Sequence, residues 1–192
     1  FNLVRRLAEQ DQKVPNGLEN ILCHGLRGSG KQAEFVSIWR IMQLIPNDEA
    51  YKTTLITALG CIGEENLLFD YLESTLGSGS HNVNYTTAQR QAVFQSALQS
   101  TVILPTFIRF MSKYSASALS TYRYTWLQIL TYVANTIKTS DDRDLFLDYS
   151  LSIPQLSGDD YRAISLIISN SLNQQKQVQY TRQLQLMSQI FP

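Results

Sequence analysis

The stretch that most constrains the fold is residues 51–76, YKTTLITALGCIGEENLLFDYLESTL. On both sides of its centre, apolar residues recur every three or four positions, which is the spacing of a helix that buries one stripe. Gly60 and Gly63 bracket a tight turn, and Gly77 follows at a position where a left-handed residue often ends a helix. The stretch therefore predicts a pair of amphipathic helices within a soluble, all-helical domain.

The same pattern continues along the chain and predicts an all-α fold of about ten helices with short loops and no convincing strand. Outside the central pair, helices are expected over residues 1–10, 17–26, 31–45, 86–98, 105–114, 122–137, 140–151, 157–168 and 174–190. Helix pairs recur at intervals of roughly 30 to 40 residues, which favours an irregular solenoid of helical hairpins of the HEAT or armadillo type. No signature repeats from pair to pair, so a compact orthogonal helical bundle is the alternative architecture.

The length of 192 residues is enough for one core without metals or dense disulfides, so residues 1–192 are expected to form a single helical domain. The sequence opens on Phe1 inside a helical pattern and ends at Pro192 without a terminating signal. We therefore expect a fragment of a larger protein. No apolar run approaches the length of a membrane span, so this fragment is not expected to insert into a membrane.

Sixteen basic and sixteen acidic residues cancel, so no overall charge favours binding to nucleic acid or to an anionic membrane. The distribution along the chain is uneven. Residues 74–140 contain no Asp or Glu but carry five basic residues, which are Arg90, Arg109, Lys113, Arg123 and Lys138. The next twenty residues contain six aspartates and one arginine. The simplest interpretation is a set of solvated faces and helix ends, because aspartate suits the first turn of a helix.

No catalytic motif is apparent. Cys23, His24, Cys61 and His81 would make a four-ligand zinc set on paper, but Cys23 and His24 are neighbours that point about 100° apart on a helix. The run GLRGSGKQ, residues 25–32, is superficially similar to a phosphate-binding loop. It lacks the Ser or Thr that holds magnesium, and it follows a predicted helix where that motif needs a strand. The fragment itself is therefore predicted to be non-catalytic, without a metal or cofactor of its own.

Two covalent features are candidates. Asn84, Tyr85 and Thr86 form an acceptor sequon for N-linked glycosylation within the longest polar loop. Cys23 and Cys61 are either bonded to each other or are two buried free thiols, and the residues alone do not decide between these states. A bond would close a loop of about forty residues, for which chain entropy predicts a gain of about 4 kcal/mol.

Four motifs in order carry a resemblance to a known family: VPNGLENILCHGL at 14–26, Phe35 and Trp39 in the pattern F-x-x-x-W, LITALGC at 55–61, and LLFDYLESTL at 67–76. Together they resemble the C-terminal domain of the gluzincin aminopeptidases of the aminopeptidase N group, particularly insect members. The resemblance covers residues 14–76 well and the remainder only by helix order. One departure is Leu22, which stands where the family has a tyrosine before the cysteine.

This resemblance implies a disulfide between Cys23 and Cys61. It also implies that the parent protein is a zinc-dependent ectopeptidase that removes N-terminal residues from peptides. The present chain would be its HEAT-like helical cap over the peptide chamber, and the catalytic domain of the same chain would hold the zinc. The family is extracellular, commonly glycosylated and membrane-anchored. Its insect members are typically attached to the cell surface by a glycosylphosphatidylinositol (GPI) lipid anchor.

Two functional classes follow from the resemblance. As a cap, the domain would contact the catalytic domain and peptide substrates, with Arg90, Arg109 and Arg123 as candidate chamber-facing residues that attract peptide carboxylates. As a binding module, its helical surface would be recognised by an external protein, such as a bacterial Cry toxin.

Overall fold

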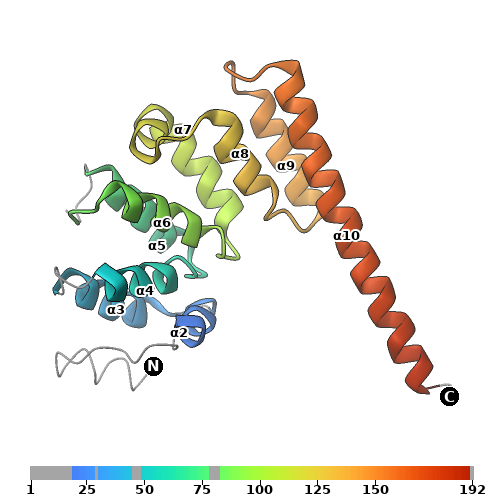
Figure 1. Ribbon diagram of the computed structural model, residues 1–192, viewed down its shortest axis with the longest axis horizontal. Coiled ribbons are helices and arrows are strands. Elements are labelled where there is room, and N and C mark those ends of the chain that lie inside the picture. Colours follow the sequence, from blue (N-terminus) through green and yellow to red (C-terminus); the bar gives the residue numbers. More distant parts are fainter. Residues whose placement is uncertain (1–18, 29, 45–48, 78–82, 191–192) are drawn as a thin grey trace. The chain divides into compact units, whose positions relative to one another are not determined.

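The computed structural model of the chain describes residues 19–28, 30–44, 49–77 and 83–190 (Figure 1). These residues form helices and connecting loops, and none of them lies in a strand. The prediction of an all-α fold is therefore confirmed, whereas the HEAT-like or armadillo-like arrangement of hairpins stays a prediction. The helix predicted over residues 1–10 and the candidate ligand His81 lie outside the described residues.

The chain divides into two compact units, Phe1–Tyr124 and Thr125–Pro192. Two compact units can belong to one domain, so the single domain predicted over residues 1–192 stays a prediction. The described elements of the first unit are α2 (Glu19–Leu26), α3 (Gln32–Leu44), α4 (Glu49–Leu59), α5 (Glu65–Glu73), a 3-10 turn η1 (Ser74–Leu76), α6 (Thr87–Ala97) and α7 (Ile103–Tyr122). Those of the second unit are α8 (Trp126–Ala134), α9 (Ser140–Leu151) and α10 (Gly158–Ile190).

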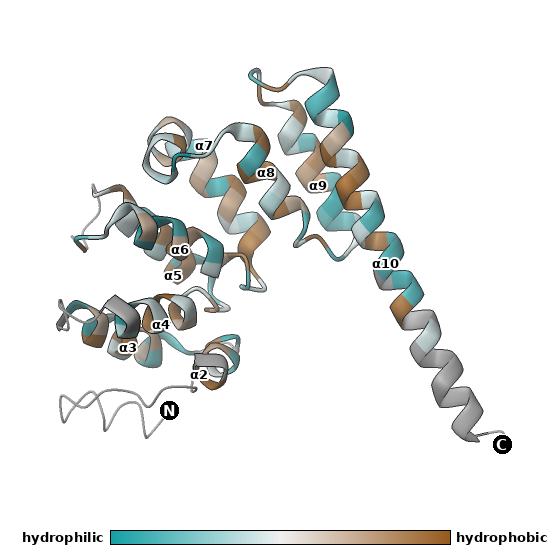
Figure 2. Cartoon of the chain, viewed as in Figure 1, coloured by the Kyte–Doolittle hydropathy of each residue, from teal (hydrophilic) through white to brown (hydrophobic). Residues whose placement is uncertain are grey.

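Helix α4 occupies the centre of the first unit, where it packs against α2, α3 and α6. Helix α5 packs against α6 and α7, and α6 in turn packs against α7. Brown and teal residues share the same helices in Figure 2, as expected for helices that bury one face and expose the other. The central pair predicted from residues 51–76 is thus the middle of this unit.

An aromatic cluster joins three of these helices. Phe35 and Trp39 of α3 meet Tyr71 of α5, with the rings of Trp39 and Tyr71 in an edge-to-face arrangement at 5.4 Å. The buried hydroxyl of Tyr71 donates to the carbonyl of Ile56 in α4 at 2.9 Å. Edge-to-face pairs and a satisfied hydroxyl allow tyrosine to fill a core without a stranded polar group.

A second buried tyrosine fixes the end of α7. Tyr122 is fully buried, packs against Phe94 with ring centroids 5.3 Å apart, and shares a hydrogen bond of 2.8 Å with the hydroxyl of Thr75. Tyr85, just before α6, is also buried. Burial raises the pKa of Tyr122 and raises the pKa of Tyr85 to about 12, because a phenolate would lose its hydration.

These tyrosines make the protein sensitive to alkali. The folded state holds the Tyr85 proton more tightly than the unfolded chain does, so stability is unaffected well below pH 10 and falls as pH rises from 10 to 12. We expect urea unfolding at pH 12 to show a loss of about 2 kcal/mol in the wild type that Tyr85→Phe does not share. At pH 7 to 9, the free energies of unfolding of the two proteins should depend on pH in the same way. The same pH dependence for both proteins between pH 10 and 12 would contradict this prediction.

The second unit packs α10 against both α8 and α9. Its buried side chains include Ile129 and Leu130 from α8, Phe146 from α9, and Ile164 and Ile168 from α10. Thr139 is the N-cap of α9, where its hydroxyl oxygen accepts a hydrogen bond from the amide of Asp142 at 3.1 Å. Among the described helices, none is long and apolar enough to cross a membrane.

The single helix predicted over residues 122–137 is wrong. Helix α7 ends at Tyr122, Arg123 adopts a left-handed conformation with φ of 56°, and α8 starts only at Trp126. Thr125 and Gln128 form a capping box, in which each side chain bonds the other's backbone amide. The apolar residues continue across this break and do not indicate it, whereas a Thr followed three residues later by a Gln does.

Helix α7 also differs from its prediction over residues 105–114. It starts at Ile103, so Pro105 lies inside the first turn, where the missing amide costs no intrahelical bond. It then continues to Tyr122 through one non-helical residue, Tyr114, with φ of −130°. The hydroxyl of Tyr114 donates to Glu73 of α5, which holds the kink against its neighbour.

The two C-terminal helices predicted over residues 157–168 and 174–190 form one continuous helix, α10. The residues where the two predicted helices meet, 168–173, are ISNSLN and include no glycine or proline. The polar residues in this interval, Ser and Asn, are tolerated inside a helix. Ser157 and Asp160 bond each other's backbone amides at its start.

Candidate functional site

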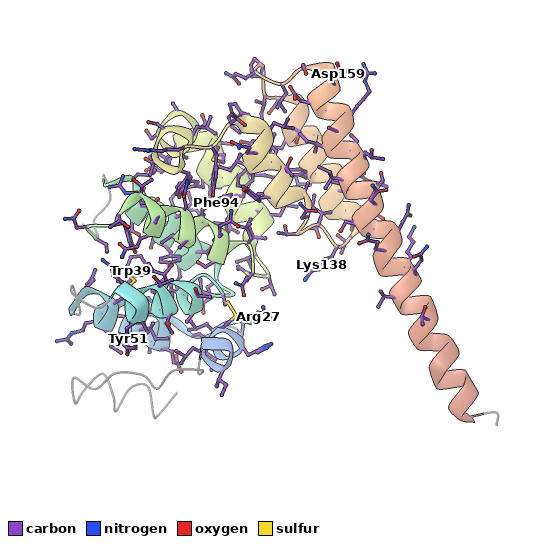
Figure 3. The ribbon with its side chains drawn as sticks, viewed as in Figure 1. Arg27, Trp39, Tyr51, Phe94, Lys138 and Asp159 are labelled. Atoms are coloured by element: carbon purple, nitrogen blue, oxygen red, sulfur yellow. A yellow bond between two sulfur atoms is a disulfide. The ribbon has the colours of Figure 1, made fainter. Side chains whose placement is uncertain are left out.

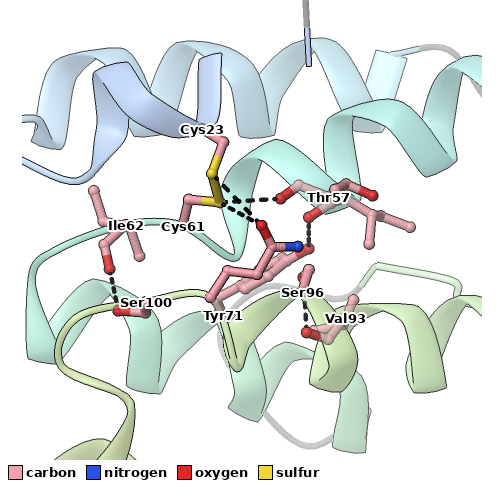
Figure 4. The surroundings of a disulfide bond; sticks show 10 residues. Cys23, Thr57, Cys61, Ile62, Tyr71, Val93, Ser96 and Ser100 are labelled. Atoms are coloured by element: carbon pink, nitrogen blue, oxygen red, sulfur yellow. Dashed lines mark hydrogen bonds between the residues drawn. A yellow bond between two sulfur atoms is a disulfide. The ribbon is translucent and has the colours of Figure 1, made fainter. Parts of the chain in front are cut away.

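The turn at residues 60–64 is where most of the sequence signals converge. Cys61 lies in this turn and Cys23 lies on α2; their sulfur atoms are 2.09 Å apart and their Cα atoms 5.0 Å apart (Figure 4). The two cysteines thus lie at disulfide distance, as the resemblance implies. Both are buried, with exposed fractions of 5% for Cys23 and 0% for Cys61. The bond connects α2 to the end of α4.

Gln99, in the loop after α6, lies against this bond. Its Oε1 atom is 3.7 Å from the sulfur of Cys23 and 3.6 Å from that of Cys61. A bonded sulfur has no proton to donate, so these are contacts of a carboxamide with the disulfide. No sequence pattern marks Gln99, because its position depends on how α6 packs against α4.

Backbone contacts hold the turn from two sides. The amide of Gly63 donates to the carbonyl of Leu26 at the end of α2, at 3.1 Å. The hydroxyl of Ser100 donates to the carbonyl of Ile62 at 2.6 Å, from the loop between α6 and α7. Residues 60–64 therefore join α2, α4 and the loop after α6 in one layer, in which residues 60–62 are buried and residues 63 and 64 are half-buried.

The two glycines of the turn allow this close approach. A Cβ atom at Gly60 would overlap the backbone and side chain of Ser96 in α6, and one at Gly63 would overlap the carbonyl of Arg27. Glu64 extends the junction to a fourth helix, because its carboxylate accepts a hydrogen bond from the amide of Lys31 at the start of α3 at 3.1 Å. A carboxylate at that position also complements the helix dipole.

The zinc and phosphate-loop alternatives have no support in this geometry. A bonded pair of sulfurs offers no thiolate to a metal, and among the described residues no three His, Cys, Asp or Glu side chains gather into a possible metal site. The glycine-rich run at residues 25–32 joins α2 to α3, as a helix boundary does.

A groove of about 490 Å³ lies between α3 and α5. Phe35, Trp39 and Leu67 contribute apolar surface to it, and Arg40 and Asp70 contribute charge. Val36, which also lines the groove, is 53% exposed. Figure 3 labels Trp39 among the side chains of this unit. The groove combines apolar and polar lining residues, which suits a side chain or peptide segment.

The three candidate chamber-facing residues occupy different settings. Arg90 lies on α6 and is half-buried; Arg123 is exposed at the end of α7, where its amide donates to the carbonyl of Leu119. Arg109 is exposed, but its guanidinium pairs with Glu65 at 3.4 Å and lies over the ring of Phe69. Residues 74–140 contain no acidic side chain, but a glutamate of α5, which packs against α7, forms an ion pair with Arg109.

The other two basic residues of that stretch are also separated by the fold. Lys113 pairs with Glu73 of α5 at 3.5 Å. Lys138 belongs to the second unit and lines a hollow of about 410 Å³ together with Arg143 and Lys176 (labelled Lys138 in Figure 3). Arg143 is paired there with Asp144 at 2.8 Å. The charge that adds up along the sequence is therefore partly compensated in space.

Asn84, the candidate glycosylation site, is exposed between residue 83 and the start of α6. No protein-family model matches the chain, and no curated protein matches it.

Proposed function

We propose that this chain is the non-catalytic, all-helical C-terminal domain of a zinc aminopeptidase of the aminopeptidase N group. In the parent protein it would cover the peptide-binding chamber, while the zinc and its ligands belong to another domain. The parent would be an extracellular enzyme, attached to the cell surface by a lipid anchor, that removes N-terminal residues from peptides. The observation that carries the proposal is the pair Cys23 and Cys61 at disulfide distance.

A second observation supports the same proposal. The motifs of the resemblance lie far apart in sequence but meet in one layer: the F-x-x-x-W pair of α3 contacts Tyr71 of the LLFDYLESTL segment. Tyr71 in turn bonds Ile56 of the LITALGC segment, whose cysteine is bonded to α2. Mutual contact gives a physical reason for these motifs to occur in a fixed order and spacing.

The assignment is tested by sequencing the transcript that encodes the chain. We expect the reading frame upstream of Phe1 to contain H-E-x-x-H on a predicted helix, the zinc-binding signature in which the glutamate is the general base. An upstream frame that lacks a zinc-binding motif, or a stop codon immediately upstream, would contradict the proposed function.

The role of the basic residues is tested in the full-length parent. If they attract peptide carboxylates, Arg90→Glu with Arg123→Glu should raise KM for peptides by about fivefold, which corresponds to about 1 kcal/mol. KM for neutral amino-acid amides should change little. Arg109→Gln is the suitable third variant, because a glutamate there would face Glu65.

Arg162→Glu is the control for this experiment, since Arg162 is 80% exposed and outside the set. It should leave the ratio of the two KM values unchanged. Equal effects of the Arg90 and Arg123 reversals on peptides and amides would remove the idea of carboxylate attraction.

A protein-binding module is the second candidate, and the groove between α3 and α5 favours it. In that case the isolated chain should bind an external protein, such as a purified insecticidal Cry toxin, in a calorimetric titration. A domain that only covers the chamber should bind none tightly. The two functions are compatible in one parent protein.

A further inference from the structure

Asn84 is the one asparagine of the sequence that is followed by any residue other than proline and then by Ser or Thr. Its side chain is exposed, and residues 83–86 are neither helix nor strand. An acceptor asparagine must reach a transferase, so an exposed, extended position is the setting that such a sequon needs.

The residues around Asn84 are anchored although Asn84 is exposed. Tyr85 is 4% exposed, and the ammonium group of Lys52 donates to the carbonyl of Asn84 at 3.3 Å. Lys52 is itself only 8% exposed and lies over the ring of Tyr85. A buried lysine that binds a main-chain carbonyl fixes the backbone here, while the Asn84 side chain lies at the surface.

Thr86 has two roles. It is the third residue of the sequon, and it is also the N-cap of α6, where its hydroxyl oxygen accepts from the amide of Gln89 at 3.2 Å. The Gln89 side chain accepts from the amide of Thr86 at 3.0 Å and completes a capping box. The hydrogen bond from Lys52 to Asn84 and the capping box at Thr86 therefore fix the backbone on both sides of Tyr85.

The buried pair Cys23 and Cys61 indicates the compartment. Disulfides of this kind form in the secretory pathway, where N-linked glycans are also added. The covalent evidence for an oxidising compartment comes from residues that are remote in sequence from Asn84.

We propose that Asn84 carries an N-linked glycan and that the start of α6 therefore faces solvent in the whole protein. The Nδ2 atom of Asn84 bonds the anomeric carbon of a lipid-pyrophosphate-linked oligosaccharide, and the bond from that carbon to the pyrophosphate oxygen breaks. The lipid pyrophosphate leaves with the electron pair, and Nδ2 loses one proton. The step involves no oxidation or reduction.

A glycan here restricts how the rest of the protein can pack. A bulky, hydrated oligosaccharide excludes another domain from the surface around it. The start of α6 is then unavailable as a contact with the catalytic domain of the proposed function. The glycan itself needs only secretion and not the aminopeptidase assignment, so the two proposals can fail separately.

The test is to secrete the chain from eukaryotic cells and to map its peptides by mass spectrometry. Amidase treatment in heavy-oxygen water converts a glycosylated asparagine to a labelled aspartate. We expect the label at Asn84 in the wild type and in Thr86→Ser, and no glycan in Asn84→Gln or Thr86→Ala. Asn173→Gln, the same change at an exposed asparagine outside any sequon, should keep the glycan.

An unmodified Asn84 peptide in the secreted protein would overturn the proposal. Its second part is tested on the whole native protein, where a glycosidase should remove the glycan without denaturation. A glycan that is released only after denaturation would overturn the solvent-facing placement of α6.

Discussion

Replacing both cysteines, Cys23→Ala with Cys61→Ala, should lower the free energy of unfolding by about 4 kcal/mol. The bond spans a sequence separation of 38 residues, so removing it restores the freedom of a long loop to the unfolded chain. A single domain is typically stable by about 5 to 15 kcal/mol, so this loss is a large share of the total. Urea unfolding followed by far-ultraviolet circular dichroism measures it.

The reduced wild type separates the cross-link from the packing of the sulfurs. Reduction keeps both sulfur atoms and adds a proton to each, so the thiols can donate to Oε1 of Gln99. The thiol of Cys61 can also donate to the carbonyl of Thr57, which lies 3.6 Å from its sulfur. We expect reduced wild type to lose nearly as much stability as the double alanine variant. Oxidised and reduced proteins with the same unfolding midpoint would contradict the role given to the bond.

Gly63→Ala should destabilise the protein by about 3 kcal/mol or more. The added methyl would overlap the carbonyl oxygen of Arg27, and the Gly63 amide is bonded to Leu26, so backbone lies on both sides. A flexible side chain can move aside, but these main-chain atoms belong to the end of α2, which Cys23 ties to the same turn. Thermal and urea unfolding should both report the loss.

Gly28→Ala is the matched control for this substitution. The nearest atom to a Cβ at Gly28 is the side-chain Cε of Lys31 at 3.7 Å, an ordinary contact with a mobile group. This variant should change stability by less than about 1 kcal/mol. If Gly63→Ala is tolerated as well as Gly28→Ala, the close packing of the turn against α2 is wrong.

Helix positions were predictable where apolar spacing and punctuation agree. Residues 31–45 have a regular buried stripe between a glycine-rich run and a proline, and the structure has α3 almost over the same range. The central pair was predictable for the same reason. Local pattern is enough when a helix buries one face and clear breakers flank it.

The errors arose where a cap interrupts an apolar run. Tyr122 and Trp126 both looked like parts of one stripe, and both patterns are real, but they belong to α7 and α8. The spacing of apolar residues does not predict the left-handed conformation of Arg123 between them. The capping box of Thr125 and Gln128 is the sequence signal that marks this boundary.

The candidate site was predictable only in part. The cysteines and the sequon are visible as residue types at fixed positions. The partners of the basic residues are not, because Glu65 and Glu73 lie on α5 and approach Arg109 and Lys113 only through packing. The groove beside Trp39 also depends on how α3 and α5 meet.

Peptide mapping of the secreted chain, alkylated and digested without reduction, shows whether Cys23 and Cys61 are bonded. We expect one cross-linked pair of peptides containing residues 23 and 61, and no alkylated cysteine. Two alkylated cysteines and no cross-linked peptide would contradict it, since both the helical layer and the proposed extracellular enzyme depend on that bond.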